Sequence, residues 1–383
     1  MRCGIVVEQN GRFGDSMFSD IYRDKKVLVT GHTGFKGSWL SAWLLRLGAN
    51  VIGISKDIPT TPSMFEEIEI ENRIKHYQED IRDLEKMKYL IHEEKPDFIF
   101  HLAAQPIVST SYSDPIETIS SNVLGTANIL EALRISNHKC SAIIITSDKC
   151  YDNVEQIWGY KEDDQMGGKD IYSGSKGAAE LIIKSYFHSF FKNEESNIRL
   201  AIGRAGNVIG GGDWAKDRIV VDCMKSWKDG QKVEIRSPKA TRPWQHVLEP
   251  LSGYLNLGMA LFNNKNLDGE AFNFGPRAEQ NRSVEDLLID LSKYWNFDDP
   301  KDAYKVTGNI PFHEAGLLKL NCDKALAYLK WSSNLEYKDT IRFTSEWYYN
   351  FYKHTKLSIF QKTMEQIREY EDKAKKRGIS WSR

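Results

Sequence analysis

Hydrophobic runs alternate with amphipathic stretches over the first half of the chain. Short apolar runs are typical of strands buried on both faces, and segments with apolar residues three or four apart are typical of helices. Strands are expected at residues 26–30, 50–55, 76–79, 97–102, 141–147 and 199–202, and helices at 37–47, 84–94, 116–135 and 172–191. Strands separated by helices predict a doubly wound, mostly parallel sheet of the α/β class.

The alternation weakens after residue 210, where Gly, Trp, Arg and Pro become frequent. This change predicts a second, smaller lobe toward the C-terminus that closes over a ligand. The predicted division is a loose N-terminal extension (1–24), the sheet domain (25–210), mainly the substrate-binding lobe (211–360, with a strand near 272–274 returning to the sheet) and a charged, solvated helical tail (361–383).

Composition excludes several classes of protein. The formal net charge is −1, so no overall field attracts the chain to nucleic acid or membrane. No apolar run approaches the roughly 20 residues that span a bilayer. The first 16 residues lack the apolar core of a secretory signal, and Met17 is a second possible start. The cysteines and histidines show no metal-ligand spacing, so we expect reduced thiols, no bound metal and a cytoplasmic location.

Three glycines join the first expected strand to the first expected helix. Gly31, Gly34 and Gly37 form a G-x-x-G-x-x-G pattern. Glycine permits a tight turn and lets backbone amides approach a pyrophosphate, whose charge the helix N-terminus favours. The spacing alone also fits a simple structural turn, but its place after the first strand favours a dinucleotide site in a Rossmann domain.

Further cofactor contacts are expected where the next strands end. The predicted cofactor-binding residues are Gly31, Thr33, Gly34, Phe35, Lys36, Asp80, Ile81, Ala103, Ala104, Gln105, Tyr172 and Lys176. NAD is the predicted cofactor, although the second strand ends in Ser55 and Lys56, with Asp57 just beyond. Because Ser and Lys could tolerate a 2′-phosphate, NADP stays an alternative. Asp80 fits a loop or capping position equally well.

Tyr172 and Lys176 lie four residues apart in a helical pattern, so they share one helix face. The lysine charge, with a nicotinium ring nearby, should lower the pKa of the tyrosine, and the phenolate could then take a hydroxyl proton while hydride leaves the same carbon. Ser147, at the end of the strand before this helix, could hold the same hydroxyl. A plain amphipathic helix would explain the spacing without any chemistry.

Asp148 and Lys149 distinguish a simple oxidation from an oxidation that is followed by loss of water. Oxidation at one carbon makes the neighbouring C–H acidic, and loss of water then needs a base for that proton and an acid for the leaving hydroxyl. Asp148, if protonated in a site of low polarity, could be the acid, and Lys149 could serve the C–H proton. The alternative is a surface salt bridge or a turn.

The second lobe offers groups for a nucleotide diphosphate. Asn207 follows the sixth expected strand, and Arg218 and Arg242 supply charge, since guanidinium matches phosphate oxygens with two donors. Each arginine could equally stabilise the lobe through ion pairs. Trp214 and Trp244 could stack on a base or sugar, or could belong to the core.

Longer motifs carry a family resemblance. They are GHTGFKGSWL (31–40), AAQP (103–106), TSDK (146–149), GNVIGGGDW (206–214) and RPWQHV (242–247). With these motifs the chain resembles the extended short-chain dehydrogenase/reductase family, and within it the 4,6-dehydratases that act on CDP-glucose. The similarity runs from about residue 17 to about residue 353.

The resemblance implies a reaction, a cofactor and an assembly. CDP-D-glucose would become CDP-4-dehydro-6-deoxy-D-glucose plus water, by oxidation at C4, elimination across C5 and C6, and return of hydride from NAD to C6. It implies Tyr172 as the C4 base and Asp148 as the acid. Lys149 stands where the dTDP-glucose dehydratases carry Glu, so the C5 base is open. A homodimer through the helices at 116–135 and 172–191, or a tetramer, is implied, with a role in deoxysugar synthesis for surface polysaccharide such as O-antigen.

Two alternatives to this function stay open. One is a dehydratase or 4-epimerase acting on another nucleotide hexose. The other is a non-catalytic dinucleotide-binding scaffold on the same fold, since fold alone does not decide function. Joint presence of Asp148, Lys149, Tyr172 and Lys176 argues against the scaffold.

Overall fold

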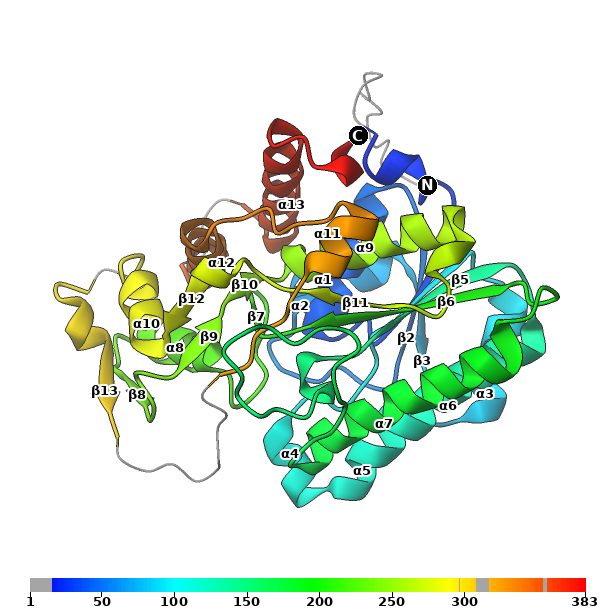
Figure 1. The fold of residues 1–383 in the computed structure, drawn as a ribbon. Coiled ribbons are helices and arrows are strands. Elements are labelled where there is room, and N and C mark those ends of the chain that lie inside the picture. Colours follow the sequence, from blue (N-terminus) through cyan, green and yellow to red (C-terminus); the bar gives the residue numbers. More distant parts are fainter. Residues whose placement is uncertain (1–15, 296, 308–316, 354–356) are drawn as a thin grey trace, which may run out of the picture.

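A seven-stranded parallel sheet forms the centre of the protein (Figure 1). The computed structural model describes residues 16–295, 297–307, 317–353 and 357–383. The strands are β1 (Lys26–Thr30), β2 (Asn50–Ser55), β3 (Lys75–Gln78), β4 (Phe98–His101), β5 (Cys140–Ile145), β6 (Ile198–Ala205) and β11 (Ala271–Phe274). Their order across the sheet is β11-β6-β5-β4-β1-β2-β3, which confirms the predicted doubly wound α/β class.

Helices cover both faces of this sheet. On one face lie α3 (Leu84–Glu94), α6 (Gly125–Ser136) and α7 (Ile171–Tyr186), and on the other lie α1 (Phe35–Arg46) and α9 (Leu248–Asn263) (Figure 1). The helix expected at 116–135 is interrupted. It comprises α5 (Pro115–Ile119), one π-helical turn (Ser120–Leu124) and α6. Burial on both faces explains why the strands read as continuous apolar runs.

The smaller lobe is built from short elements. Its strand pairs are β7 (Val208–Ile209) with β10 (Gln245–His246), β9 (Thr241–Pro243) with β12 (Asn281–Ser283), and β8 (Val233–Ile235) with β13 (Tyr304–Val306). The helices here are α8 (Ile219–Trp227), α10 (Val284–Ser292), α11 (Asp323–Leu329) and α12 (Tyr337–Tyr352). Two segments of the 211–360 interval belong to the sheet domain instead: β11 pairs with β6, as expected, and α9 packs on β5 and β6.

The expectation of a loose N-terminal extension is wrong for its described part. Phe18 is fully buried and stacks on Trp381, with ring centroids 4.9 Å apart. The Tyr22 hydroxyl donates a hydrogen bond of 2.6 Å to the carbonyl of Leu255 in α9. Aromatic packing therefore fixes residues 17–22 to the core. Residues 1–15 lie outside the described part of the chain.

The C-terminal tail is helical, but it is not simply solvated. Helix α13 (Ile359–Lys376) buries Tyr370 and Glu371 against α1. The indole nitrogen of Trp43 donates to Glu371 Oε1 at 2.9 Å, and Arg46 pairs with the other carboxylate oxygen at 2.7 Å. One face of α13 thus completes the core behind the glycine loop. Within the described ranges, no helix is long and apolar enough to cross a membrane.

Candidate active site

A single cavity of about 1270 Å³ lies where the strands end. It extends from the glycine loop after β1, past the ends of β2 to β6, to the smaller lobe. All the predicted site residues line it: Gly31, Thr33, Gly34, Phe35, Lys36, Asp80, Ile81, Ala103, Ala104, Gln105, Ser147, Asp148, Lys149, Tyr172, Lys176, Asn207, Arg218 and Arg242. The fold therefore brings these residues together, and their individual roles stay predictions.

The glycine loop leaves room for a ligand backbone at the start of α1. Gly31 has a φ of +74°, which side chains other than glycine rarely adopt. A Cβ on Gly37 would lie 2.1 Å from the carbonyl oxygen of Gly31, so only glycine fits there. Gly34 is the N-cap of α1. A cradle without side chains at a helix N-terminus fits a dinucleotide pyrophosphate.

The end of β2 is tied to this loop. The Ser55 hydroxyl accepts a hydrogen bond of 3.3 Å from the backbone N–H of Thr33 and lies 3.0 Å from His32 Nδ1. The Thr33 hydroxyl donates to the carbonyl oxygen of Asp57 at 2.7 Å. Burial lowers the pKa of His32 to about 4, with a further contribution from His76, so this imidazole is neutral near pH 7. Sequence analysis did not identify His32 as a support for the loop.

Tyr172 and Lys176 lie buried on the first turns of α7. The lysine Nζ is 5.9 Å from the centre of the tyrosine ring. Burial raises the pKa of Tyr172 to about 12, while Arg218 acts in the opposite direction. In the protein without a cofactor, burial thus outweighs nearby positive charge, whereas the expected lowering of this pKa also depends on a nicotinium ring. Burial also lowers the pKa of Lys176 to about 8.

Asp148 is buried at the end of β5, beside the tyrosine. Its carboxylate accepts a hydrogen bond of 2.9 Å from the Ser147 hydroxyl. Burial raises the pKa of Asp148, and the nearby charges of Lys149 and Lys36 oppose that shift. Lys36, expected only as a cofactor residue, thus also acts electrostatically on the proposed acid. Burial lowers the pKa of Lys36 to about 8.

A buried ion pair holds the two halves of this site together. Glu180, one turn after Lys176 on α7, pairs with Arg204 of β6 at 2.5 Å, and both side chains are fully buried. The Thr146 hydroxyl donates to Glu180 at 2.6 Å, and Arg204 donates to the Tyr151 hydroxyl at 2.6 Å. Thr146 and Tyr151 flank the segment that carries Asp148. Sequence analysis missed this pair, although a charged residue ending an apolar strand was a signal for it.

The lobe residues divide between cavity and core. Asn207, Arg218 and Arg242 reach the cavity. Trp214 touches the cavity wall but is almost fully buried, and its ring packs on Trp347. His246 is fully buried between aromatic rings, and its Nε2 has no hydrogen-bond partner among the described residues. Within the same residues, no group of three or more His, Cys, Asp or Glu is arranged to hold a metal.

The sequence profile of the GDP-mannose 4,6-dehydratase family matches residues 28–344, which include nearly all of the sheet domain and most of the smaller lobe. With this match and the cavity at the strand ends, the chain belongs to this family of extended short-chain dehydrogenases/reductases. It is 46% identical over 332 residues to CDP-glucose 4,6-dehydratase of Salmonella typhimurium, covering 86% of this chain and 92% of the relative. CDP-paratose 2-epimerase of Salmonella typhi is 27% identical over 84% of the chain and 98% of its own length.

Solved structures share the fold. UDP-glucose 4-epimerase of Thermotoga maritima, solved with UDP-glucose, superimposes with a TM-score of 0.72 at 20% identity, over 85% of this chain and 99% of the other. The dTDP-glucose 4,6-dehydratase DesIV of Streptomyces venezuelae, solved with NAD, gives a TM-score of 0.71 at 18% identity. The match covers 85% of this chain and 97% of DesIV. At these identities, the likeness concerns architecture alone.

Proposed function

We propose that the protein is a nucleotide-sugar 4,6-dehydratase that converts CDP-D-glucose to CDP-4-dehydro-6-deoxy-D-glucose and water with NAD as cofactor. The observation that carries this proposal is the burial of Tyr172, Lys176 and Asp148 in one cavity with the glycine loop. The 46% identity to a CDP-glucose 4,6-dehydratase supports the substrate. We further propose a role in deoxysugar synthesis for surface polysaccharide.

The first chemical task falls to Tyr172. NAD, bound along the glycine loop, would accept a hydride from C4 and later return it to C6. Tyr172 takes the C4 hydroxyl proton as that hydride leaves, and Ser147 holds the hydroxyl. Because burial keeps the pKa of the phenol near 12, deprotonation needs positive charge close by. Lys176 and Arg218 are the chain's own sources of that charge.

The second task falls to Asp148. Its raised pKa favours the protonated form, which can donate a proton to the C6 hydroxyl as that group leaves as water. Removal of the C5 proton creates the electron pair that expels the hydroxyl, and Lys149 on the cavity wall is the proposed base, which returns a proton to C5 when hydride is added at C6. A 4-epimerase needs neither step. We therefore favour a dehydratase over the epimerase function of the structural neighbour.

Incubation with CDP-glucose and NAD should produce the alkaline absorbance of a 4-keto-6-deoxy sugar. The dTDP-, UDP- and GDP-glucose analogues and GDP-mannose, assayed side by side, test the base specificity. We expect turnover with CDP-glucose to exceed the others by about tenfold or more, the difference that one well-formed polar recognition site provides. Formation of a C4 epimer without the keto sugar would contradict the proposal, and so would stronger turnover of another nucleotide.

We also propose that the protein is a homodimer formed through α5, the π turn and α7. Large apolar side chains stand out from these segments, with 71% of Ile116, 52% of Leu124 and 57% of Leu181 exposed. Because α5 and the π turn pack against α7, these side chains lie on neighbouring segments, and exposed apolar surface of this kind marks an interface in soluble proteins. The family resemblance implies a dimer through the same helices.

Leu181→Lys, combined with Ile116→Lys, should convert the dimer to a monomer, because two buried ammonium groups per subunit would be uncompensated. Sedimentation velocity reports the change in mass. Tyr89→Lys on α3 is the matched control, since Tyr89 is 61% exposed but lies away from α5 and α7. A wild-type protein that sediments as a monomer would rule out this dimer.

A further inference from the structure

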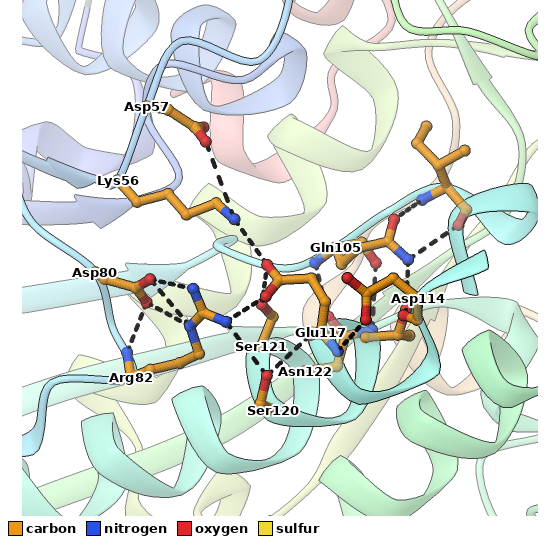
Figure 2. Close-up of polar contacts among 12 residues, drawn as sticks. Lys56, Asp57, Asp80, Arg82, Gln105, Asp114, Glu117, Ser120, Ser121 and Asn122 are labelled. Carbon is orange, nitrogen blue, oxygen red and sulfur yellow. Dashed lines mark hydrogen bonds and ion pairs between the residues drawn. The ribbon is translucent and has the colours of Figure 1, made fainter. Parts of the chain in front are cut away.

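The loop after β2 carries the one cation that could favour NADP, and the structure shows that this cation is already paired. Lys56 Nζ lies 2.7 Å from Glu117 Oε1 of α5 and 3.9 Å from Asp57 (Figure 2). Lys56, Asp57 and Asp80 line the cavity, at the strand ends where the adenosine ribose of a dinucleotide binds. Glu117 reaches Lys56 from the helix across from that loop.

Other contacts hold Glu117 in place. The second carboxylate oxygen of Glu117 forms an ion pair with Arg82. Arg82 also forms an ion pair with Asp80, with 2.5 Å between Nη2 and Oδ2. The Ser121 hydroxyl donates to Glu117 Oε1 at 3.1 Å. Figure 2 shows the resulting chain of contacts from Asp80 through Arg82 and Glu117 to Lys56. Arg82 and Ser121 therefore hold the Glu117 carboxylate in position, and this carboxylate in turn orients the Lys56 ammonium group.

The side chains that form this network of contacts carry a net negative charge. Three carboxylates (Asp57, Asp80 and Glu117) face two cations (Lys56 and Arg82), which leaves one net negative charge. The hydrogen bond from Arg82 keeps the pKa of Asp80 below its ordinary value. Partial burial opposes ionisation of Glu117, but Lys56 and Arg82 hold its pKa below the ordinary value too. Asp80 and Glu117 therefore carry negative charge near pH 7.

We propose that Glu117 determines the cofactor specificity of this protein: by neutralising Lys56 it prevents recognition of a 2′-phosphate and makes the site selective for NAD over NADP. The proposal rests on the proposed function, because it takes a nicotinamide dinucleotide as the ligand of the cavity. A 2′-phosphate would meet net negative charge, and Lys56 could bind it only by leaving Glu117 and Asp57. A ribose 2′-hydroxyl carries no charge and meets no such barrier.

Direct binding of NAD⁺ and NADP⁺, measured by calorimetry without sugar nucleotide, tests the proposal. Wild-type protein should bind NAD⁺ at least about tenfold more tightly than NADP⁺. Glu117→Gln removes one negative charge and leaves Lys56 unneutralised. The variant should bind NADP⁺ about tenfold more tightly than wild type, with NAD⁺ affinity changed by less than about threefold. The double variant Lys56→Met/Glu117→Gln should lose most of that gain.

Asp114→Asn is the matched control. Asp114 lies on the same helix, and its carboxylate accepts the Glu117 backbone N–H at 2.9 Å as the N-cap of α5. Asparagine caps a helix equally well, so this variant removes the same charge without freeing Lys56. Its ratio of NAD⁺ to NADP⁺ affinity should match wild type. Equal change in the Asp114 and Glu117 variants would show a general charge effect and overturn the specific role of Glu117.

Lys56→Met keeps the proposal testable if the Glu117 variant does not fold. Lys56→Met makes this partly exposed network one charge more negative, which solvent screening limits to a small effect, but it removes no contact with a 2′-phosphate, so NADP⁺ affinity should stay within about threefold of wild type. A loss of about tenfold or more would mean that Lys56 binds the phosphate, and the proposal would be wrong. Failure of wild type to bind either dinucleotide would instead defeat the proposed function, which separates the two hypotheses.

Discussion

Asp148→Asn should retain oxidation at C4 but slow the loss of water by a factor of about 10² to 10⁴, the usual contribution of a general acid. Asparagine is nearly isosteric and can still accept the Ser147 hydrogen bond, but it has no proton to give to the leaving hydroxyl. With CDP-glucose present, reduced nicotinamide should therefore accumulate on the enzyme and be visible by its near-ultraviolet absorbance. Tyr172→Phe, in contrast, should show neither reduced cofactor nor keto sugar.

Asp213→Asn is the matched control for this experiment. Asp213 lines the same cavity, and burial raises its pKa in the same direction. Its carboxylate accepts the Ala215 backbone N–H at 3.0 Å, a bond that asparagine can also accept. We expect its turnover to proceed without accumulated reduced cofactor. Normal turnover by the Asp148 variant would remove Asp148 from the role of acid.

Arg204→Met should destabilise the fold by about 3–5 kcal/mol, because it leaves Glu180 buried without its partner. The methionine stem fills a similar volume, so lost charge compensation dominates the effect. Urea denaturation monitored by tryptophan fluorescence gives the free energy of unfolding. The surface pair Lys305–Glu234 provides the control, since both side chains are more than half exposed. Lys305→Met should cost less than about 1 kcal/mol.

The double variant Arg204→Met/Glu180→Leu distinguishes charge from packing. Removing both charges eliminates the unpaired carboxylate, so the double variant should be more stable than Arg204→Met alone. It should nevertheless remain slow in catalysis, because Thr146 and Tyr151 lose the partners that fix the segment around Asp148. A double variant no more stable than the single one would show that packing, not charge, explains the loss.

The sheet and its cavity could be predicted because the underlying signals are local. Most strands of the first domain are short apolar runs, with the edge strand β3 as the exception, and the change to helical periodicity follows within a few residues. In a parallel sheet the residues after each strand meet at one edge. For this reason residues as distant as Gly31, Asp148 and Asn207 could be assigned to one cavity without knowledge of any contact.

The missed features depend on contacts between distant segments. Arg204 near the end of an apolar strand was a signal for a buried partner, but only the packing of α7 on β6 identifies Glu180 as that partner. The sequence also does not show desolvation, which raises the pKa of Tyr172 in the protein without a cofactor because it outweighs nearby positive charge. Lys56 was predicted to tolerate a 2′-phosphate because its partner, Glu117, lies 61 residues away in the sequence.

The packing of α13 on α1 has a consequence for biosynthesis. Trp43 belongs to the helix that starts at the glycine loop, yet its covering residues Tyr370, Glu371 and Trp381 lie more than 300 positions later. On the ribosome, the sheet and α1 emerge long before that cover exists. A nascent chain must therefore carry an exposed tryptophan face until residues 370–381 emerge, and transiently exposed apolar surface of this kind makes a nascent chain prone to aggregation.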